Sequence, residues 1–285
     1  MSQNQKPAAE KLCAYVIGYP VKHSRSPMIH NYWLQKLGLN GCYNHAEIAP
    51  EELSAAIAAM RAAGFRGANV TVPHKEAIFA LCDSVSARAK SIGAVNTIWL
   101  ADGQLHGDNT DYFGFGQNLT DFAPTWETGK TALVLGAGGA ARAVVYALVA
   151  AGYDKIYLVN RSLERAQNLV ALGPQHIIPI PWPHMPEILP QADIMVNTTS
   201  LGMKGQPDLE IDLSDAKPGL IVNDIVYVPL ETALLRQARA RGLNGVDGLG
   251  MLLHQAVPGF EHWFGQKPAV TAELRARVIR NIEGA

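Results

Sequence analysis

A short apolar strand, a glycine-rich turn and a helical stretch follow one another without a break from residue 131, and this run constrains the fold more than any other feature. Thr131–Leu135 leads directly into Gly136-Ala137-Gly138-Gly139-Ala140-Ala141, which satisfies G-x-G-x-x-A with a strand before it and a helix after it. Gly136 permits the tight turn, Gly138 lets the backbone approach a pyrophosphate, and the helix N-terminus presents unpaired N–H groups to the anion. The run predicts a dinucleotide site that includes Ala137, Gly139 and Ala140. A glycine-rich turn that binds nothing is the alternative.

The second strand of this unit ends in basic rather than acidic residues. An NAD site usually places Asp or Glu there for the ribose 2′-hydroxyl, but Asn160-Arg161-Ser162 and then Arg165 follow Val159. An arginine at about 4 Å attracts each phosphate charge by roughly 1 to 4 kcal/mol, whereas a carboxylate would repel it. These residues predict NADP(H). The alternative is a helix start capped by Asn160 with two exposed arginines, although basic residues in a first turn oppose the helix dipole.

Six short apolar runs alternate with turns and helical stretches in this half of the chain, near 131–135, 155–159, 176–180, 193–196, 219–223 and 244–246. Their order predicts a Rossmann-type, doubly wound parallel sheet. Thr198 follows the fourth strand, at the edge where an open sheet binds the cofactor, so it is a candidate for the nicotinamide side. A local Asx or Ser/Thr turn explains the segment equally well.

The residues before this unit predict a separate α/β domain. Its expected strands are 12–17, 42–48 and 67–72, with a hairpin of 97–100 and 104–107, and its expected helices run from Ser26-Pro27 to Gly38 and from Leu53 to Gly64. Two helices after the sixth strand have no place in the parallel sheet, so we expect them to return to the first domain. The predicted domains are therefore 1–112 with 249–285, for substrate, and 113–248, for NADP.

Charge and cysteine usage exclude several classes of partner and site. The 24 Lys and Arg nearly balance the 25 Asp and Glu, which argues against nucleic acid or a charged membrane surface as partner. The first ten residues are polar, and no window approaches the roughly 18 apolar residues of a membrane span. Cys13, Cys42 and Cys82 fit neither a disulfide framework nor a metal site. We expect a cytoplasmic protein without a bound metal.

Four polar clusters follow or flank the strands of the first domain: Ser24–Ser26, Asn69–Lys75, Ala94–Thr97 and Asp108–Asp111. Helix caps explain Ser26 and Asp111 equally well, and a turn explains Asn96. Lys75 is harder to explain locally, because a cation in a helix turn opened by Pro73 is disfavoured by roughly 0.3 to 1 kcal/mol. Lys75 is therefore a catalytic candidate, with a surface lysine as the alternative.

Taken together, these segments resemble the shikimate dehydrogenase family over the whole chain. The matching signatures are Gly18–Pro27, Asn69–Lys75, Gly93–Thr97, Asn109–Asp111, Gly136–Ala140, Asn160–Ser162 and Asp247–Gln255. The resemblance implies reversible reduction of 3-dehydroshikimate to shikimate by NADPH, in the pathway to chorismate and aromatic amino acids. It also implies Lys75 as the catalytic residue. We hypothesise that Lys75 protonates the C3 oxygen while Asp111 orients the lysine and the C4 hydroxyl.

The resemblance implies the remaining site residues as well. For substrate they are Ser24, Ser26, Thr71, Lys75, Asn96, Asp111, Tyr227 and Gln255. For the cofactor they are the glycine turn, Asn160, Arg161, Ser162, Arg165, Thr198, Ile225 and Gly248. Two positions depart from the family pattern: Ala87, where many relatives have an acid, and Ile225, where some have methionine.

Two other activities and two assembly states stay open from the sequence. A quinate or dual quinate/shikimate dehydrogenase is the nearest alternative, because the sequence does not show whether the pocket admits the extra C1 hydroxyl. A non-catalytic NADP-binding sensor is more distant, since it predicts loss of the Lys75 and Asp111 pair. We expect a monomer or a homodimer.

Overall fold

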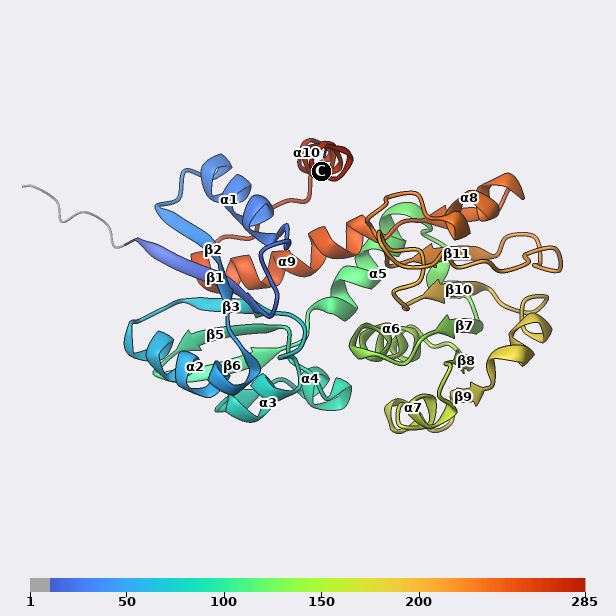
Figure 1. The fold of residues 1–285 in the computed structure, drawn as a ribbon, viewed down its shortest axis with the longest axis horizontal. Helices are drawn as coiled ribbons and strands as arrows, with labels where there is room; N and C mark the ends of the chain where they lie inside the picture. Colours follow the sequence, from blue (N-terminus) through green and yellow to red (C-terminus); the bar gives the residue numbers. More distant parts are fainter. Residues whose placement is uncertain (1–10, 285) are drawn as a thin grey trace, which may run out of the picture. The chain divides into compact units, whose positions relative to one another are not determined.

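The computed structural model describes residues 11–284 (Figure 1), so the polar first ten residues lie outside the described part. The chain divides into two compact units. The first unit holds the chain through Val85, Val95–Asp108 and Ala256–Ala269; the second holds Ser86–Ala94, Asn109–Gln255 and the chain from Val270 onward. This division differs from the predicted boundaries, which placed 86–94, 109–112, 249–255 and the last helix with the first domain.

The first unit is built on a six-stranded sheet in the order β2-β1-β3-β5-β6-β4. Its strands are β1 (Leu12–Gly18), β2 (Gly41–Glu47), β3 (Gly67–Val70), β4 (Ser84–Val85), β5 (Thr97–Ala101) and β6 (Gln104–Asp108). β1 runs parallel to β2 and β3, whereas β5 runs antiparallel to β3 and to β6. The amino end of β5 therefore lies at the same edge as the carboxyl ends of β1 and β3, which brings three of the predicted polar clusters to one edge.

Helices α1 (Ser26–Lys36) and α2 (Leu53–Ala62), the latter preceded by a 3₁₀ turn (Pro50–Glu52), lie on opposite faces of this sheet (Figure 1). The predicted helices and hairpin are confirmed. The prediction that Pro73 opens a helix is wrong, because residues 72–76 form a turn and the short α3 (Ala77–Leu81) begins after it. His74 N donates to Thr71 O at 2.9 Å and closes that turn. Proline favours turns as well as helix starts, and here the turn is formed.

The second unit holds a six-stranded, fully parallel sheet in the order β12-β11-β10-β7-β8-β9. The strands are β7 (Thr131–Leu135), β8 (Lys155–Val159), β9 (Ile177–Ile180), β10 (Ile194–Asn197), β11 (Ile221–Asp224) and β12 (Asn244–Val246). Each predicted strand is present within two residues at either end. The chain order reverses between β7 and β10, and such a switch point is where open α/β sheets bind ligands.

The second unit also holds helices α4 (Ala87–Ile92), α5 (Asp111–Phe122), α6 (Gly139–Ala150), α7 (Leu163–Gln167), α8 (Ala233–Ala240) and the last helix, α10 (Ala272–Glu283). Short 3₁₀ turns cover Trp126–Thr128, Val170–Leu172 and Trp182–Glu187. Helix α9 (Leu249–Phe264) contributes its first residues to this unit and the rest to the first. Arg275 of α10 pairs with Asp247 and lies over the Phe122 ring, which explains why α10 belongs here.

The cysteine prediction is wrong for one pair. Cys13 of β1 and Cys42 of β2 occupy matching positions on neighbouring parallel strands, 4.8 Å apart at Cα, and form a disulfide. Strand register decides this contact, and a spacing of 29 residues does not report register. Cys82 is a free thiol, and burial raises its pKa to about 11. In residues 11–284 no helix is long and apolar enough to cross a bilayer.

Candidate active site

The glycine turn after β7 leaves open space where a pyrophosphate would lie. A Cβ added at Gly138 or Gly139 would meet no atom within 4 Å. Helix α6 begins here with no side-chain cap and no acidic residue in its first turn. Its first N–H groups therefore keep their capacity to bind an anion, and the helix dipole favours negative charge at this end.

Gly136 and Thr198 meet at the switch point of the second sheet. Gly136 has φ +103°, and a Cβ there would stand 2.7 Å from Thr198 Oγ1. Thr198 donates from its backbone N (2.8 Å) and its Oγ1 (2.6 Å) to Leu135 O. The loop after β10 is thus held against the glycine turn, and only glycine fits between them.

The basic cluster lies at the end of β8, as predicted, but its local structure differs. Ser162, not Asn160, is the N-cap of α7, and Asn160 Nδ2 donates to Ser162 O at 2.9 Å. Arg165 falls in the last turn of this five-residue helix, so the expected conflict with the helix dipole does not arise. Arg161 and Arg165 are exposed, and within the described residues neither makes a hydrogen bond or ion pair.

A buried carboxylate that the sequence did not predict holds the loops at the carboxyl edge of the second sheet. Asp224, at the end of β11, accepts from Asn197 Nδ2 (2.9 Å), Val226 N (3.0 Å) and Thr232 Oγ1 (2.7 Å). Burial raises the pKa of Asp224 despite these three donors. Asn197 Oδ1 in turn accepts from the backbone and the hydroxyl of Thr199. The signal in the sequence was an Asp and an Asn at the ends of neighbouring apolar strands.

The other predicted residues of the cofactor side lie just beyond β11. Gly248 packs against Ile225, and a Cβ at Gly248 would stand 2.1 Å from Ile225 O. Both Ile225 and Tyr227 are partly exposed. The backbone contact fixes Ile225 and Gly248 relative to each other, so glycine is required at position 248.

Asp111 and Gln255 are brought close together within the second unit. Asp111 is the first residue of α5 and is buried, and its backbone N donates to Asn109 Oδ1 at 3.1 Å. Thr110 Oγ1 donates to Gln255 O at 2.8 Å, while Gly114 of α5 packs on the Gln255 backbone. The predicted role of Gln255 came from the resemblance alone, and the packing of α9 on α5 accounts for its position.

In the first unit, Ser24, Ser26, Thr71 and Lys75 lie beyond the carboxyl ends of β1 and β3. Ser24 Oγ donates to Ser26 Oγ at 3.3 Å and accepts from Ser26 N. Thr71 N donates to Ile17 O at 2.9 Å, and Gly18 leaves just enough room for the Thr71 methyl group. Lys75 is partly exposed, and its carbonyl accepts from Val95 N at 2.9 Å.

Asn96 lies immediately before β5 and is almost fully buried. Its backbone N donates to Asp108 O, and its side-chain Oδ1 accepts from Thr97 Oγ1 at 3.0 Å. Asn96 therefore lies at the same edge of the first sheet as the serine pair. Asp111 belongs to the second unit.

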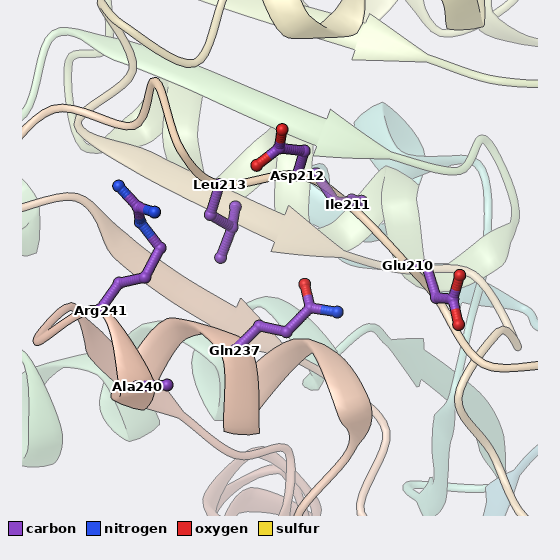
Figure 2. Close-up of a pocket in the computed structure, with 7 residues that line it drawn as sticks. All are labelled: Glu210, Ile211, Asp212, Leu213, Gln237, Ala240 and Arg241. Atoms are coloured by element: carbon purple, nitrogen blue, oxygen red, sulfur yellow. The ribbon is translucent and has the colours of Figure 1, made fainter.

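One open hollow lies away from the predicted site residues. A hollow of about 430 Å³ is lined by Glu210, Ile211, Asp212, Leu213, Gln237, Ala240 and Arg241 (Figure 2). It lies between the segment before β11 and helix α8, and none of the predicted site residues lines it. Within the described part of the chain no group of three His, Cys, Asp or Glu side chains is placed to hold a metal ion.

Three family models match this chain in succession. The model described as "Shikimate dehydrogenase substrate binding domain" matches residues 16–98, "Shikimate / quinate 5-dehydrogenase" matches 122–204, and "Shikimate 5'-dehydrogenase C-terminal domain" matches 248–275. They cover the segments after β1, the glycine turn and the start of α9.

Individual relatives agree with the family models. A shikimate dehydrogenase (NADP(+)) of Brucella abortus strain S19 is 50% identical over 275 residues, covering 95% of each chain. The solved shikimate 5-dehydrogenase of Thermus thermophilus, in complex with NADP(H) and shikimate, is 37% identical with a TM-score of 0.84, covering 95% of this chain and 99% of its own. A quinate dehydrogenase of Corynebacterium glutamicum in complex with NAD is 32% identical with a TM-score of 0.88, covering 95% and 99%. This chain belongs to the shikimate dehydrogenase family.

Proposed function

We propose that this chain catalyses the reversible, NADPH-dependent reduction of 3-dehydroshikimate to shikimate, a step towards chorismate and the aromatic amino acids. One observation carries the proposal above all others. At the end of β8, where NAD enzymes place an acid, two exposed arginines stand without partners among the described residues. This chain of the shikimate dehydrogenase family thus offers guanidinium groups to a 2′-phosphate.

The cofactor is held by groups of residues 113–248. The N–H groups at Gly138 and Gly139 receive the pyrophosphate, and Arg161 and Arg165 pair with the 2′-phosphate beside Asn160 and Ser162. Thr198, Ile225 and Gly248 take the nicotinamide end. When bound, NADPH supplies the hydride for the reduction.

The substrate is held by groups of residues 1–112 and 249–285. Ser24, Ser26, Thr71, Asn96 and Gln255 bind its hydroxyls and carboxylate, and Tyr227 contributes from residues 113–248. Hydroxyl and amide groups suit a small acid that carries several hydroxyls, because they can donate to its oxygens or accept from its hydroxyls.

Lys75 and Asp111 carry the proton chemistry. As the C3 carbonyl is reduced, negative charge develops on its oxygen, and the Lys75 ammonium donates a proton there. In the reverse direction the neutral lysine takes that proton back. Asp111, buried at the start of α5, orients the lysine and accepts from the C4 hydroxyl.

The decisive assay follows absorbance of the reduced nicotinamide with shikimate or quinate, each with NADP or NAD. We expect the highest kcat/KM for shikimate with NADP. A higher kcat/KM with quinate would instead favour the alternative that this chain is a quinate dehydrogenase. The likeness to the Corynebacterium glutamicum enzyme supports that alternative. No turnover with either acid would refute the enzymatic proposal and leave the NADP-binding sensor.

We also propose a cytoplasmic location and a monomeric or homodimeric state. NADPH-dependent biosynthetic reductions draw on the cytoplasmic pool of the cofactor. Cell fractionation tests the location, and light scattering of the purified protein tests the assembly.

Thiol alkylation in the same extracts, followed by mass spectrometry, would reveal whether Cys13 and Cys42 are joined in the cell.

A further inference from the structure

A continuous line of hydrogen bonds joins Tyr43 to Asn96 inside the first unit. Tyr43 donates to Asn69, and Asn69 donates to Thr97. Thr97 then donates to Asn96 at 3.0 Å. Tyr43 and Thr97 are fully buried, and Asn69 is 5% exposed. The line therefore runs through the protein interior and ends in Asn96, a proposed substrate-binding residue.

The backbone carbonyl of Asn96 fixes the direction of this line. A carbonyl can only accept, so the Asn69 amide atom that faces it, at 3.5 Å, is Nδ2. The same nitrogen donates to Thr97 Oγ1 at 3.3 Å. Oδ1 of Asn69 then faces the opposite way, where it accepts from Tyr43 Oη at 2.7 Å. The orientation of the amide is thus set by its surroundings.

His30 supports the same orientation from the other side. Its Nε2 lies 3.2 Å from Asn69 Oδ1, so the imidazole must carry its proton on Nε2. Burial lowers the pKa of His30 to about 3, which keeps the ring neutral with a single N–H. Within the described residues Nδ1 has no partner, in agreement with a bare lone pair there. Tyr43 stacks on this ring with centroids 4.0 Å apart.

The direction of the Thr97 hydroxyl sets the orientation of the Asn96 side-chain amide. Thr97 Oγ1 accepts from Asn69, so its own hydrogen is the one that goes to Asn96 Oδ1. The carbonyl end of the Asn96 amide is thereby held on Thr97, and the other end is a donor only. An N–H donor binds a hydroxyl, carbonyl or carboxylate oxygen, whereas a flipped amide would present an acceptor that repels carbonyls and carboxylates.

We propose that Thr97 is a positioning residue that holds the carbonyl end of the Asn96 amide and so places its N–H end on the side opposite Thr97, as a donor to a substrate oxygen, with Tyr43 and Asn69 setting the direction of the hydroxyl. This rests on the proposed function, because it assigns Asn96 to a substrate oxygen. Thr97 itself needs no contact with substrate.

The test compares Thr97→Val with Thr97→Ser. Valine keeps the shape of threonine and removes the hydroxyl, whereas serine keeps the hydroxyl and removes the methyl group. We expect Thr97→Val to raise the KM for shikimate about tenfold, with the KM for NADP and kcat within about twofold of the parent protein. Thr97→Ser should keep the shikimate KM within about twofold. Thermal unfolding of both variants separates this effect from a general loss of stability.

Equal changes in the valine and serine variants, or an unchanged shikimate KM in Thr97→Val, would overturn the proposal. If Thr97→Val does not fold, Tyr43→Phe decides, since it removes the donor at the other end of Asn69. A raised shikimate KM with an unchanged NADP KM supports the line of bonds, and no change in either refutes it. The parent protein separates the two proposals: without shikimate turnover there the proposed function fails, and this inference with it.

Discussion

The two units prepare their ligand-facing edges in opposite ways. The second unit offers backbone N–H groups at an open turn and two exposed arginines, which the described residues leave unpaired. The first unit offers side chains whose orientation is set by buried hydrogen bonds, such as Asn96 held by Thr97. An anion of fixed shape is bound by backbone and charge, which need little support. A small ring with several hydroxyls needs donors and acceptors that cannot rotate.

This contrast predicts where single substitutions do most harm. In the first unit, losing one polar group should alter turnover or substrate binding and leave cofactor binding intact. In the second unit, changes should act on cofactor affinity and on the local backbone.

The largest effect should come from Lys75→Ala. Loss of the proposed proton donor should lower kcat by roughly a hundredfold or more, because general acid catalysis contributes about that much. The KM for NADP should stay near the parent value. Lys22→Ala is the control, since Lys22 is an exposed lysine of the same unit paired with Glu47. Turnover equal to the parent in Lys75→Ala would remove the lysine from the mechanism.

The next largest effect should differ between two glycines of the same turn, Gly136 and Gly138. Gly136→Ala should lower the free energy of unfolding by about 1 to 3 kcal/mol, because φ +103° is strained for alanine and its Cβ would stand 2.7 Å from Thr198 Oγ1. Gly138→Ala should leave stability nearly unchanged, because its Cβ meets open space, and should raise the KM for NADP. Urea unfolding and kinetics on both variants check this. A stability loss in Gly138→Ala as large as that in Gly136→Ala would contradict the assignment.

Arg161→Ala tests the charge at the end of β8. Removing one guanidinium should raise the KM for NADP about tenfold and leave the KM for NAD within about twofold, because only NADP carries the 2′-phosphate. Arg236→Ala is the matched control, an exposed arginine of α8 that bonds a backbone carbonyl. Equal changes for the two cofactors would show that Arg161 does not read the phosphate.

The same contrast explains what the sequence predicted well. Strands of the second sheet are continuous apolar runs, and the turn after β7 is a local pattern of glycines, so both are visible within a few residues. The hairpin of β5 and β6 was visible for the same reason, through Asp102-Gly103 between two short strands. Local patterns therefore predict most of the fold and the proposed anion-binding half of the site.

Most features that the sequence did not predict depend on contacts between residues far apart in the chain. The disulfide depends on the register of β1 against β2, and Asn69 meets Thr97 only because β3 pairs with β5. The start of α3 was misplaced because proline favours both a turn and a helix start, and the hydrogen bond from His74 to Thr71 decides between them. Asp224 and Thr232 were missed for a similar reason, since their contact crosses from a strand end to the next helix.

The smallest effect should be the pH dependence of stability that His30 imposes on the first unit. Burial lowers its pKa to about 3 from 6.5. Between these values the unfolded chain binds a proton that the folded protein does not, so stability falls as the pH drops below about 6.5. From pH 6 to pH 5 His30 alone should cost about 1 kcal/mol of unfolding free energy. Tyr43 adds nothing here, because burial raises its pKa far above this range.

Urea unfolding of the parent protein and of His30→Gln at pH 6 and pH 5 isolates this contribution. The variant will be less stable at both values, because His30 is buried in an aromatic cluster with Trp33, Tyr43 and Phe260. Its loss between the two values should nevertheless be smaller than the parent's by about 1 kcal/mol. Parallel curves for the parent and His30→Gln would mean that His30 accepts a proton in the folded state, and the single N–H that orients Asn69 would no longer be assured.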